Sequence, residues 1–131
     1  MGMFTGMTIP GTRETDMSDA PILGPLNLVD DLASAGDFEK KHTPHIDVDE
    51  VDEGLLVTVT VGWDVPHPNQ PDHYITWIEL LAGEAPIARF ELSPIATTPV
   101  VSVVVNVDPG TILRAIEHCN LHGLWAADIT V

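Results

Sequence analysis

The sequence is poor in cysteine, in basic residues and in aromatic residues. Its 131 residues include one cysteine and only 5 lysines and arginines, and aromatic side chains make up 5%. One cysteine cannot form an internal disulfide, so a hydrophobic core must hold the fold together. With 20 acidic residues the formal net charge is −15. This charge excludes the clustered positive patches that bind nucleic acids and anionic membranes, and we expect neither partner.

Long apolar stretches are also missing. No run approaches the roughly 20 residues that cross a bilayer, and the first residues lack the basic start and apolar core of a secretory signal. We therefore expect a cytoplasmic protein. The length is that of one domain, which buries roughly two thirds of its unfolded surface. The acidic excess is typical of a solvated surface, and adaptation to high salt is the alternative.

The hydrophobic pattern divides the chain into two parts. Residues 1–36 show no sustained period of 2 or 3.6, so we expect an irregular N-terminal arm with one helical turn at 30–35. From Ile46 onward, short β-rich runs alternate with turn signals. Seven strands are predicted: Ile46–Val48, Leu55–Val61, Tyr74–Leu81, Ile87–Leu92, Val100–Val107, Ile112–His118 and Ala126–Val131. This spacing without helical patterns favours an antiparallel β-sandwich over a barrel or a βαβ fold.

The residues that could carry chemistry are histidines and the single cysteine. His67 and His73 lie in a loop, 64–73, that three prolines stiffen, which suits a preorganised site. Cys119 and His122 are three residues apart, so a thiolate and an imidazole from one turn can reach the same ion. A thiolate with several neutral imidazoles suits iron, copper or zinc, whereas magnesium and calcium prefer oxygen ligands.

Each of these residues also has a purely structural interpretation. Cys119 could be a small buried hydrophobe, and a histidine beside proline, such as His67, is often a surface loop residue. His118 adjoins Cys119, so on an extended strand its side chain points to the opposite face. We expect that neither His118 nor His45 binds a metal.

Three groups of residues match known motifs when taken in chain order. They are Lys41-His42-Thr43-Pro44, then His67-Pro68-Asn69 with His73-Tyr74-Ile75 and Trp77-Ile78-Glu79-Leu80, then Cys119-Asn120-Leu121-His122-Gly123-Leu124-Trp125. Together they resemble the superoxide reductase family, and more narrowly neelaredoxin, its single-iron form. The resemblance covers about residues 37 to 131. It implies an all-β, seven-stranded immunoglobulin-like antiparallel sandwich, with an arm at 1–36 and an iron-binding domain at 37–131.

The resemblance also implies a metal site and a reaction. The four equatorial nitrogen ligands of one mononuclear non-haem iron would be His42, His67, His73 and His122, and Cys119 would be the axial sulfur ligand. The position opposite the thiolate would be open to solvent. The reaction of the family is the one-electron reduction of superoxide to hydrogen peroxide. By resemblance, the aromatic residues Trp125, Trp77 and Tyr74 are expected to pack around the metal.

One part of the family motif departs from the usual pattern. Lys41 matches the family lysine that attracts the superoxide anion beside the first histidine. A glutamate usually precedes that lysine and can close the oxidised iron, but this chain has Lys40 there. The nearest acid is Glu39: either the loop shifts to present its carboxylate to the iron, or the site works without it. In both cases we expect that Glu39 does not act in the primary reaction.

The electron must come from another protein. The second iron centre of desulfoferrodoxin needs four cysteines, which this chain lacks, so the resemblance implies an external donor such as rubredoxin. It also implies a homotetramer. The alternatives are a cupredoxin-like electron carrier and a non-catalytic immunoglobulin-like interaction module. The carrier would need an axial methionine after the cysteine, but the methionines are Met1, Met3, Met7 and Met17.

Overall fold

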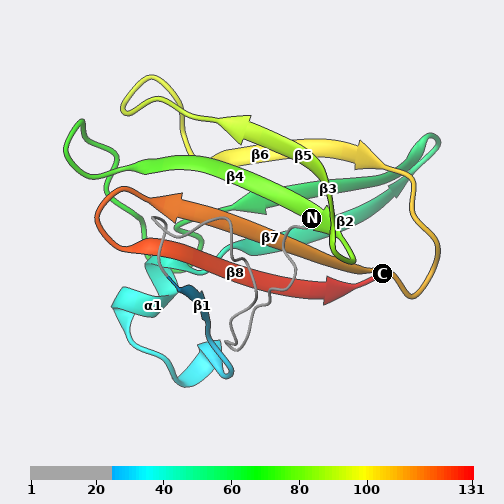
Figure 1. Cartoon of the computed structure of the whole chain (residues 1–131), viewed down its shortest axis with the longest axis horizontal. Coiled ribbons are helices and arrows are strands. Elements are labelled where there is room, and N and C mark those ends of the chain that lie inside the picture. The colour runs from blue at the N-terminus through cyan, green and yellow to red at the C-terminus, as the bar shows by residue number, and fades with distance from the viewer. Residues whose placement is uncertain (1–24) are drawn as a thin grey trace.

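The protein is a sandwich of two β-sheets (Figure 1), as seen in a computed structural model that describes residues 25–131. The elements in chain order are β1 (Leu26–Leu28), the 3₁₀ turn η2 (Leu32–Ser34), α1 (Asp37–His42), β2 (His45–Val51), β3 (Gly54–Thr60), β4 (Ile75–Ala82), β5 (Ala85–Glu91), β6 (Val100–Val105), β7 (Ile112–Cys119) and β8 (Gly123–Thr130). Residues 1–24 of the predicted arm lie outside the described residues, and these include all four methionines.

The two sheets have strand orders β1-β8-β7-β4-β5 and β2-β3-β6. All strand pairs are antiparallel except β1 with β8, which is parallel. The predicted antiparallel sandwich is confirmed. Each of the seven predicted strands is present, with no end shifted by more than three residues.

Two elements were not predicted from the sequence. β1 has three residues, too few to show a period, and it forms because Leu26 is buried against a cluster that includes Leu124. α1 has six residues, and Phe38 is its one large apolar side chain, so no helical stripe is visible. The helical turn expected at 30–35 is present as η2. No helix among residues 25–131 has the length and apolar character to cross a membrane.

The core lies between the sheets and follows from strand alternation. Val57 and Val59 on β3 face Leu113 and Ala115 on β7, and all four are at most 2% exposed. Because successive strand residues point to opposite faces, Cys119 belongs to the same inner row as Leu113 and is completely buried. The cysteine is therefore anchored on the rigid part of the fold.

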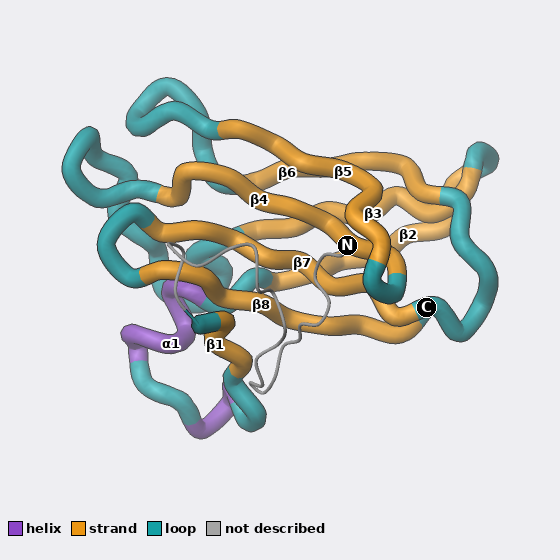
Figure 2. The backbone as a smooth tube through the Cα atoms, viewed as in Figure 1, coloured by secondary structure: helices purple, strands orange, loops and turns teal. Residues whose placement is uncertain are grey.

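The segments that carry His42, His67, His73 and His122 gather at one end of the sandwich, together with the β5–β6 loop. Figure 2 shows α1, the long β3–β4 loop, the β5–β6 loop and the β7–β8 turn at this end. Gly62 starts the β3–β4 loop at a φ of 91°, and a Cβ there would lie 2.8 Å from the backbone nitrogen of His67. Glycine at this position lets the loop fold back closely and bring His67 over the end of the sandwich.

Candidate metal centre

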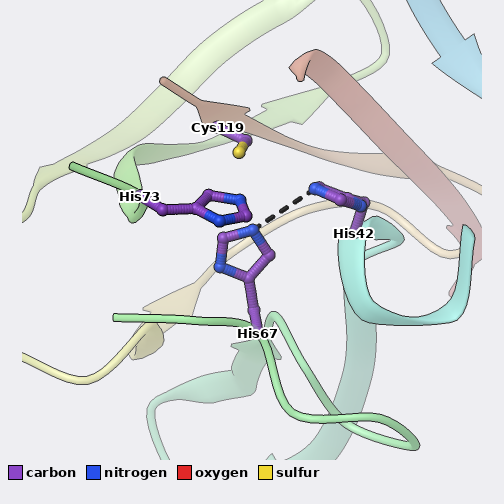
Figure 3. Close-up of side chains that lie close together, drawn as sticks. All are labelled: His42, His67, His73 and Cys119. Carbon is purple, nitrogen blue, oxygen red and sulfur yellow. Dashed lines mark hydrogen bonds between the residues drawn. The ribbon is translucent and has the colours of Figure 1, made fainter. Parts of the chain in front are cut away.

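Four separate segments bring one thiol and four imidazoles together at this end. His42 is the last residue of α1, His67 and His73 lie on the β3–β4 loop, and Cys119 ends β7. The potential ligand atoms of these four residues all lie within 4.8 Å of one another. Figure 3 shows their side chains pointing toward a shared space. His122, on the β7–β8 turn, places its Nδ1 3.7 Å from the Cys119 Sγ.

The four imidazole rings form a closed ring of neighbours, which we call the histidine square. The centroid distances around it are 4.8 Å from His42 to His67, 4.8 Å from His67 to His73, 5.1 Å from His73 to His122, and 5.0 Å from His122 back to His42. Adjacent rings are tilted by 68–81°. Such an arrangement directs ring nitrogens from four sides toward one centre.

Hydrogen bonds to carbonyl oxygens fix which nitrogen of two rings faces inward. The Nδ1 of His42 lies 2.7 Å from the Phe38 carbonyl oxygen, and the Nδ1 of His67 lies 2.6 Å from the Pro68 carbonyl oxygen. A carbonyl only accepts, so both Nδ1 atoms carry the proton and each neutral ring keeps its lone pair on Nε2. This is the usual outer hydrogen bond of a metal-binding histidine.

The inward nitrogens then lack partners within the protein. The Nε2 atoms of His42 and His67 are 3.3 Å apart, the contact drawn dashed in Figure 3, and in these tautomers two lone pairs face each other. The Nε2 of His73 is buried without a hydrogen-bond partner. Unsatisfied buried nitrogen atoms are costly, and one cation at the centre relieves all three. The donor set therefore fits a nitrogen- and sulfur-preferring metal.

Burial favours the neutral form of three of the imidazoles, which is the form that binds a metal. Burial lowers the pKa of His67 to about 4, outweighing the hydrogen bond to Pro68 that raises it. Burial likewise lowers the pKa of His42 and His73. The positive charge of Lys41 lowers the pKa of these three histidines further, so the field of this lysine reaches the site.

The thiol depends on a metal for its ionisation. Cys119 is completely buried, and burial raises its pKa, although hydrogen bonds from the backbone of Leu121 and His122 lower it. Glu117, two residues before it on the inner face, raises the pKa of the thiol further. A bound cation provides the positive charge that a thiolate needs in such a place.

Aromatic residues hold the square in place. Trp125 stacks on His42 with ring centroids 4.9 Å apart, and its Nε1 donates to the His122 carbonyl oxygen. Phe38 contacts His42, His122 and Trp125 edge-on or tilted. The prediction for Trp125 agrees with this packing. The prediction for Trp77 is wrong, because Trp77 lies on the outer face of its sheet, between the Arg89 guanidinium and the His118 ring.

The two histidines expected to have no metal role lie apart from the square. His118 stacks on Trp77, and its Nδ1 is 2.7 Å from the Thr76 hydroxyl. His45 stacks on Trp63 and lies 3.4 Å from Asp47. Both rings have other partners and neither contacts the histidine square.

Two asparagines of the site were missed in the sequence. Asn69 joins the histidine loop to the β5–β6 loop: its Nδ2 donates to the Thr97 carbonyl oxygen at 2.8 Å, and its Oδ1 accepts from the Ile95 amide at 3.0 Å. Asn120 joins the turn after Cys119 to the β3–β4 loop, which carries His67 and His73. It accepts from the Tyr74 amide and donates to the Asp72 carbonyl oxygen. Both follow a proposed ligand closely in the matched motifs, which is the signal that could have indicated them.

Glu117 was also missed. It is completely buried on the inner face of β7, neither of its carboxyl oxygens has a hydrogen-bond partner, and burial raises its pKa well above the ordinary value. Burial of this kind favours the uncharged form of a carboxyl. Nothing in the sequence distinguishes it from the exposed acids, because only the register of β7 places it inward.

Comparison with known proteins settles the family. The desulfoferrodoxin family model matches residues 34–128. The chain belongs to the desulfoferrodoxin family. Among curated members, superoxide reductase of Pyrococcus horikoshii is 35% identical, covering 72% of this chain and 91% of that protein. Superoxide reductase of Thermococcus kodakarensis is 34% identical, covering 74% and 93%.

Solved structures of family members have the same fold. The superoxide reductase (neelaredoxin) of Ignicoccus hospitalis is 31% identical with a TM-score of 0.68, covering 79% of this chain and 91% of that chain. A reduced-form variant of superoxide reductase (neelaredoxin) from Archaeoglobus fulgidus is 30% identical with a TM-score of 0.66, covering 75% and 94%. The family resemblance seen in the sequence motifs is confirmed.

Proposed function

We propose that this chain is a superoxide reductase whose mononuclear non-haem iron is held by His42, His67, His73, His122 and Cys119. The observation that carries the proposal is the closed histidine square with a buried thiol beside it. Family membership and the relatives named superoxide reductase support the same reaction. Superoxide takes up one electron and two protons and leaves as hydrogen peroxide.

The iron supplies the electron when bound, by changing between its ferrous and ferric states. The chain's own residues prepare the site for it. His42 and His67 present neutral Nε2 atoms because carbonyl oxygens hold their Nδ1 protons. Cys119 supplies sulfur from the rigid core, and His122 alone of the five is exposed, which supports an opening to solvent on its side.

Lys41 attracts the anionic substrate in this proposal. Its charge reaches His42, His67 and His73, and it is half-buried on α1, next in sequence to His42. In a chain of net charge −15, such a local cation offsets the repulsion of superoxide.

Glu39 does not take the role of the family glutamate in this proposal. Its carboxylate Oε1 lies 3.3 Å from the point that a Cβ on Gly36 would occupy, at the start of α1. A carboxylate in the first turn is stabilised by the helix dipole. This position supports the expectation that Glu39 does not act in the primary reaction.

The remaining parts of the proposal concern location and partners. The iron-binding domain spans residues 37–131, which the family match at 34–128 supports. The electron comes from an external donor such as rubredoxin, since one cysteine cannot build a second iron–sulfur centre. The protein works in the cytoplasm as a homotetramer, and its free buried cysteine is in keeping with a reducing compartment.

The alternatives explain the site less well. A cupredoxin-like carrier uses two histidines and a cysteine, which leaves two rings of the square without a purpose. An interaction module without metal leaves the His73 Nε2 buried and unpaired. Neither alternative accounts for four imidazoles directed at one centre.

Metal analysis of the purified protein tests the proposal. We expect about one iron per chain, and we expect Cys119→Ser to lose the thiolate-to-iron charge-transfer absorption and most of the activity. His118→Ala and His45→Ala are the controls and should retain iron. Zinc as the native metal, or an unchanged spectrum in Cys119→Ser, would contradict the assignment.

A further inference from the structure

The end of the sandwich opposite the histidine square is open and forms a groove between the two sheets. The groove lies where the β2–β3 hairpin, the β6–β7 loop and the end of β8 meet, at the end that carries the label C in Figure 1. Its volume is about 790 Å³. Small-molecule sites in proteins have volumes of roughly 300–1,000 Å³, so the groove has the size of a ligand site.

Aliphatic side chains form the floor of the groove. They continue the inward rows of the strands beyond the packed core, and they are only partly buried: Val48, Leu55, Val107, Ile129 and Val131. An aliphatic ligand that covered this floor would remove apolar surface from water, which is favourable. The floor therefore suits an apolar chain.

One acid of the groove belongs to the inward face of its strand. Successive strand residues alternate between faces, so Glu50 on β2 shares the face of Ile46 and Val48, which pack against the core. In the ladder between β2 and β3, Glu50 lies opposite Leu55. Glu50 is nevertheless exposed, because the sandwich is open at this end. A carboxylate therefore lies beside the aliphatic floor.

The groove carries negative charge without positive charge. Glu50 and Asp108 line it, and no lysine, arginine or histidine does. Among residues 25–131 neither of these acids forms an ion pair, and the two arginines of this part of the chain pair with Glu91 and Asp128 instead. In a chain of net charge −15, such a site attracts a cation and repels an anion.

The backbone sets one wall of the groove. Gly54, at the start of β3, has a φ of 150°, and a Cβ there would lie 2.7 Å from the Asn106 Oδ1. Both residues line the groove. Glycine thus allows the hairpin to lie closely against the end of β6. The shape of the groove is part of the folded chain and does not require a ligand to form it.

We propose that this groove binds a small amphipathic cation, an ammonium group attached to an aliphatic chain. The aliphatic chain covers the apolar floor, and the ammonium group is attracted by Glu50 and Asp108. A fatty acid has the same apolar part, but its carboxylate would be repelled by these two acids. The groove and the histidine square lie at opposite ends of the sandwich, so this inference does not depend on the proposed function.

Three ligands with the same chain and different head groups test the proposal. Octylammonium, octanol and octanoate are titrated separately into the iron-loaded protein by calorimetry, below the concentrations at which they aggregate. We expect octylammonium to bind most tightly, at one per chain, and octanoate most weakly. Each methylene removed from the alkylammonium should weaken binding by up to about four-fold. The absence of saturable octylammonium binding, or equally tight binding of octanoate, would overturn the proposal.

Two matched pairs of variants locate the site. Glu50→Gln should weaken octylammonium binding by up to about five-fold and leave octanol binding unchanged, whereas Glu53→Gln, an exposed acid of the same hairpin outside the groove, should change neither. Val51→Ser should weaken both ligands, and Val104→Ser, a similarly exposed valine outside the groove, should weaken neither. Iron content and the visible spectrum report that each variant is folded and loaded. Equal effects of the two glutamate variants on octylammonium would overturn the proposal.

Discussion

At the scale of single residues, burial lowers the pKa of His42, His67 and His73 and so favours the neutral imidazole, which is the form that binds metal. The pKa of His67 is lowered to about 4 from an ordinary 6.5, chiefly by burial. Between these two values the unfolded chain binds a proton that the folded chain does not. Stability from this residue is therefore fully present above pH 6.5 and is lost as the pH falls toward 4.

The lowered pKa of His67 predicts how the stability of the metal-free protein depends on pH. We expect the urea midpoint of the metal-free wild type to fall steadily as the pH is lowered from 6.5 toward 4. His67→Ala removes the buried imidazole, so its midpoint should fall less over the same range. His45→Ala is the control, since His45 lies at the surface beside Trp63. Parallel curves for the wild type and His67→Ala would show that His67 is not buried in its neutral form.

The role of Lys41 is also decided at this scale. Its positive charge acts on His42, His67 and His73, whereas Asp72, beside His73, is the one acid among the described residues whose charge acts on these rings. Salt screens the distant charges first, because the Debye length is about 8 Å at physiological ionic strength. We expect Lys41→Met to slow the second-order reaction with superoxide by roughly ten-fold, and the slowing should persist at moderate salt. Equal rates by pulse radiolysis at several salt concentrations would remove Lys41 from the mechanism.

At the scale of elements, the site depends on contacts between loops. Ile95 has a φ of 68°, which is strained for a β-branched residue, and Asn69 accepts from its amide. Asn69 thereby holds the β5–β6 loop against the loop that carries His67 and His73. The β-sheet positions Cys119, and the side chains of Asn69 and Asn120 link the loops that carry the histidines.

Removal of this link should weaken metal binding without unfolding the sandwich. We expect Asn69→Ala to lower metal affinity by about 10–100-fold, the usual effect of a residue that supports a ligand. Asn106→Ala, at the far end of β6, is the matched control. Affinity is measured by competition with a chelator, using thermal unfolding to confirm the fold. Equal affinities in the two variants would show that the loops hold the histidines without Asn69.

The longer strands could be predicted from the sequence, whereas the shortest elements could not. Alternation of Val and Thr in β3 predicts a half-buried strand, and the structure has one there. β1 and α1 could not be predicted, because three and six residues are too few for a period and both depend on tertiary contacts such as Leu26 with Leu124. Trp77 was placed wrongly because strand register, and not proximity in sequence to a histidine, decides which face a side chain occupies.

At the scale of the whole molecule, one end of the sandwich is the frame on which the site is built. The matched motifs predicted which histidines converge, since the structure brings the rings of His42, His67, His73 and His122 into one square. The position of Asn69 and Asn120 beside proposed ligands could have singled them out, but the sequence could not show which groups they bind or that Glu117 is buried, because these contacts form only in the folded chain.

The central claim is that the iron-loaded chain reduces superoxide without oxidising a second superoxide. The most direct test is the product ratio, measured with a calibrated superoxide source and excess external reductant. The account predicts one hydrogen peroxide for each superoxide consumed, with no oxygen released. Release of oxygen, with one hydrogen peroxide for every two superoxides, would identify a dismutase and contradict the account.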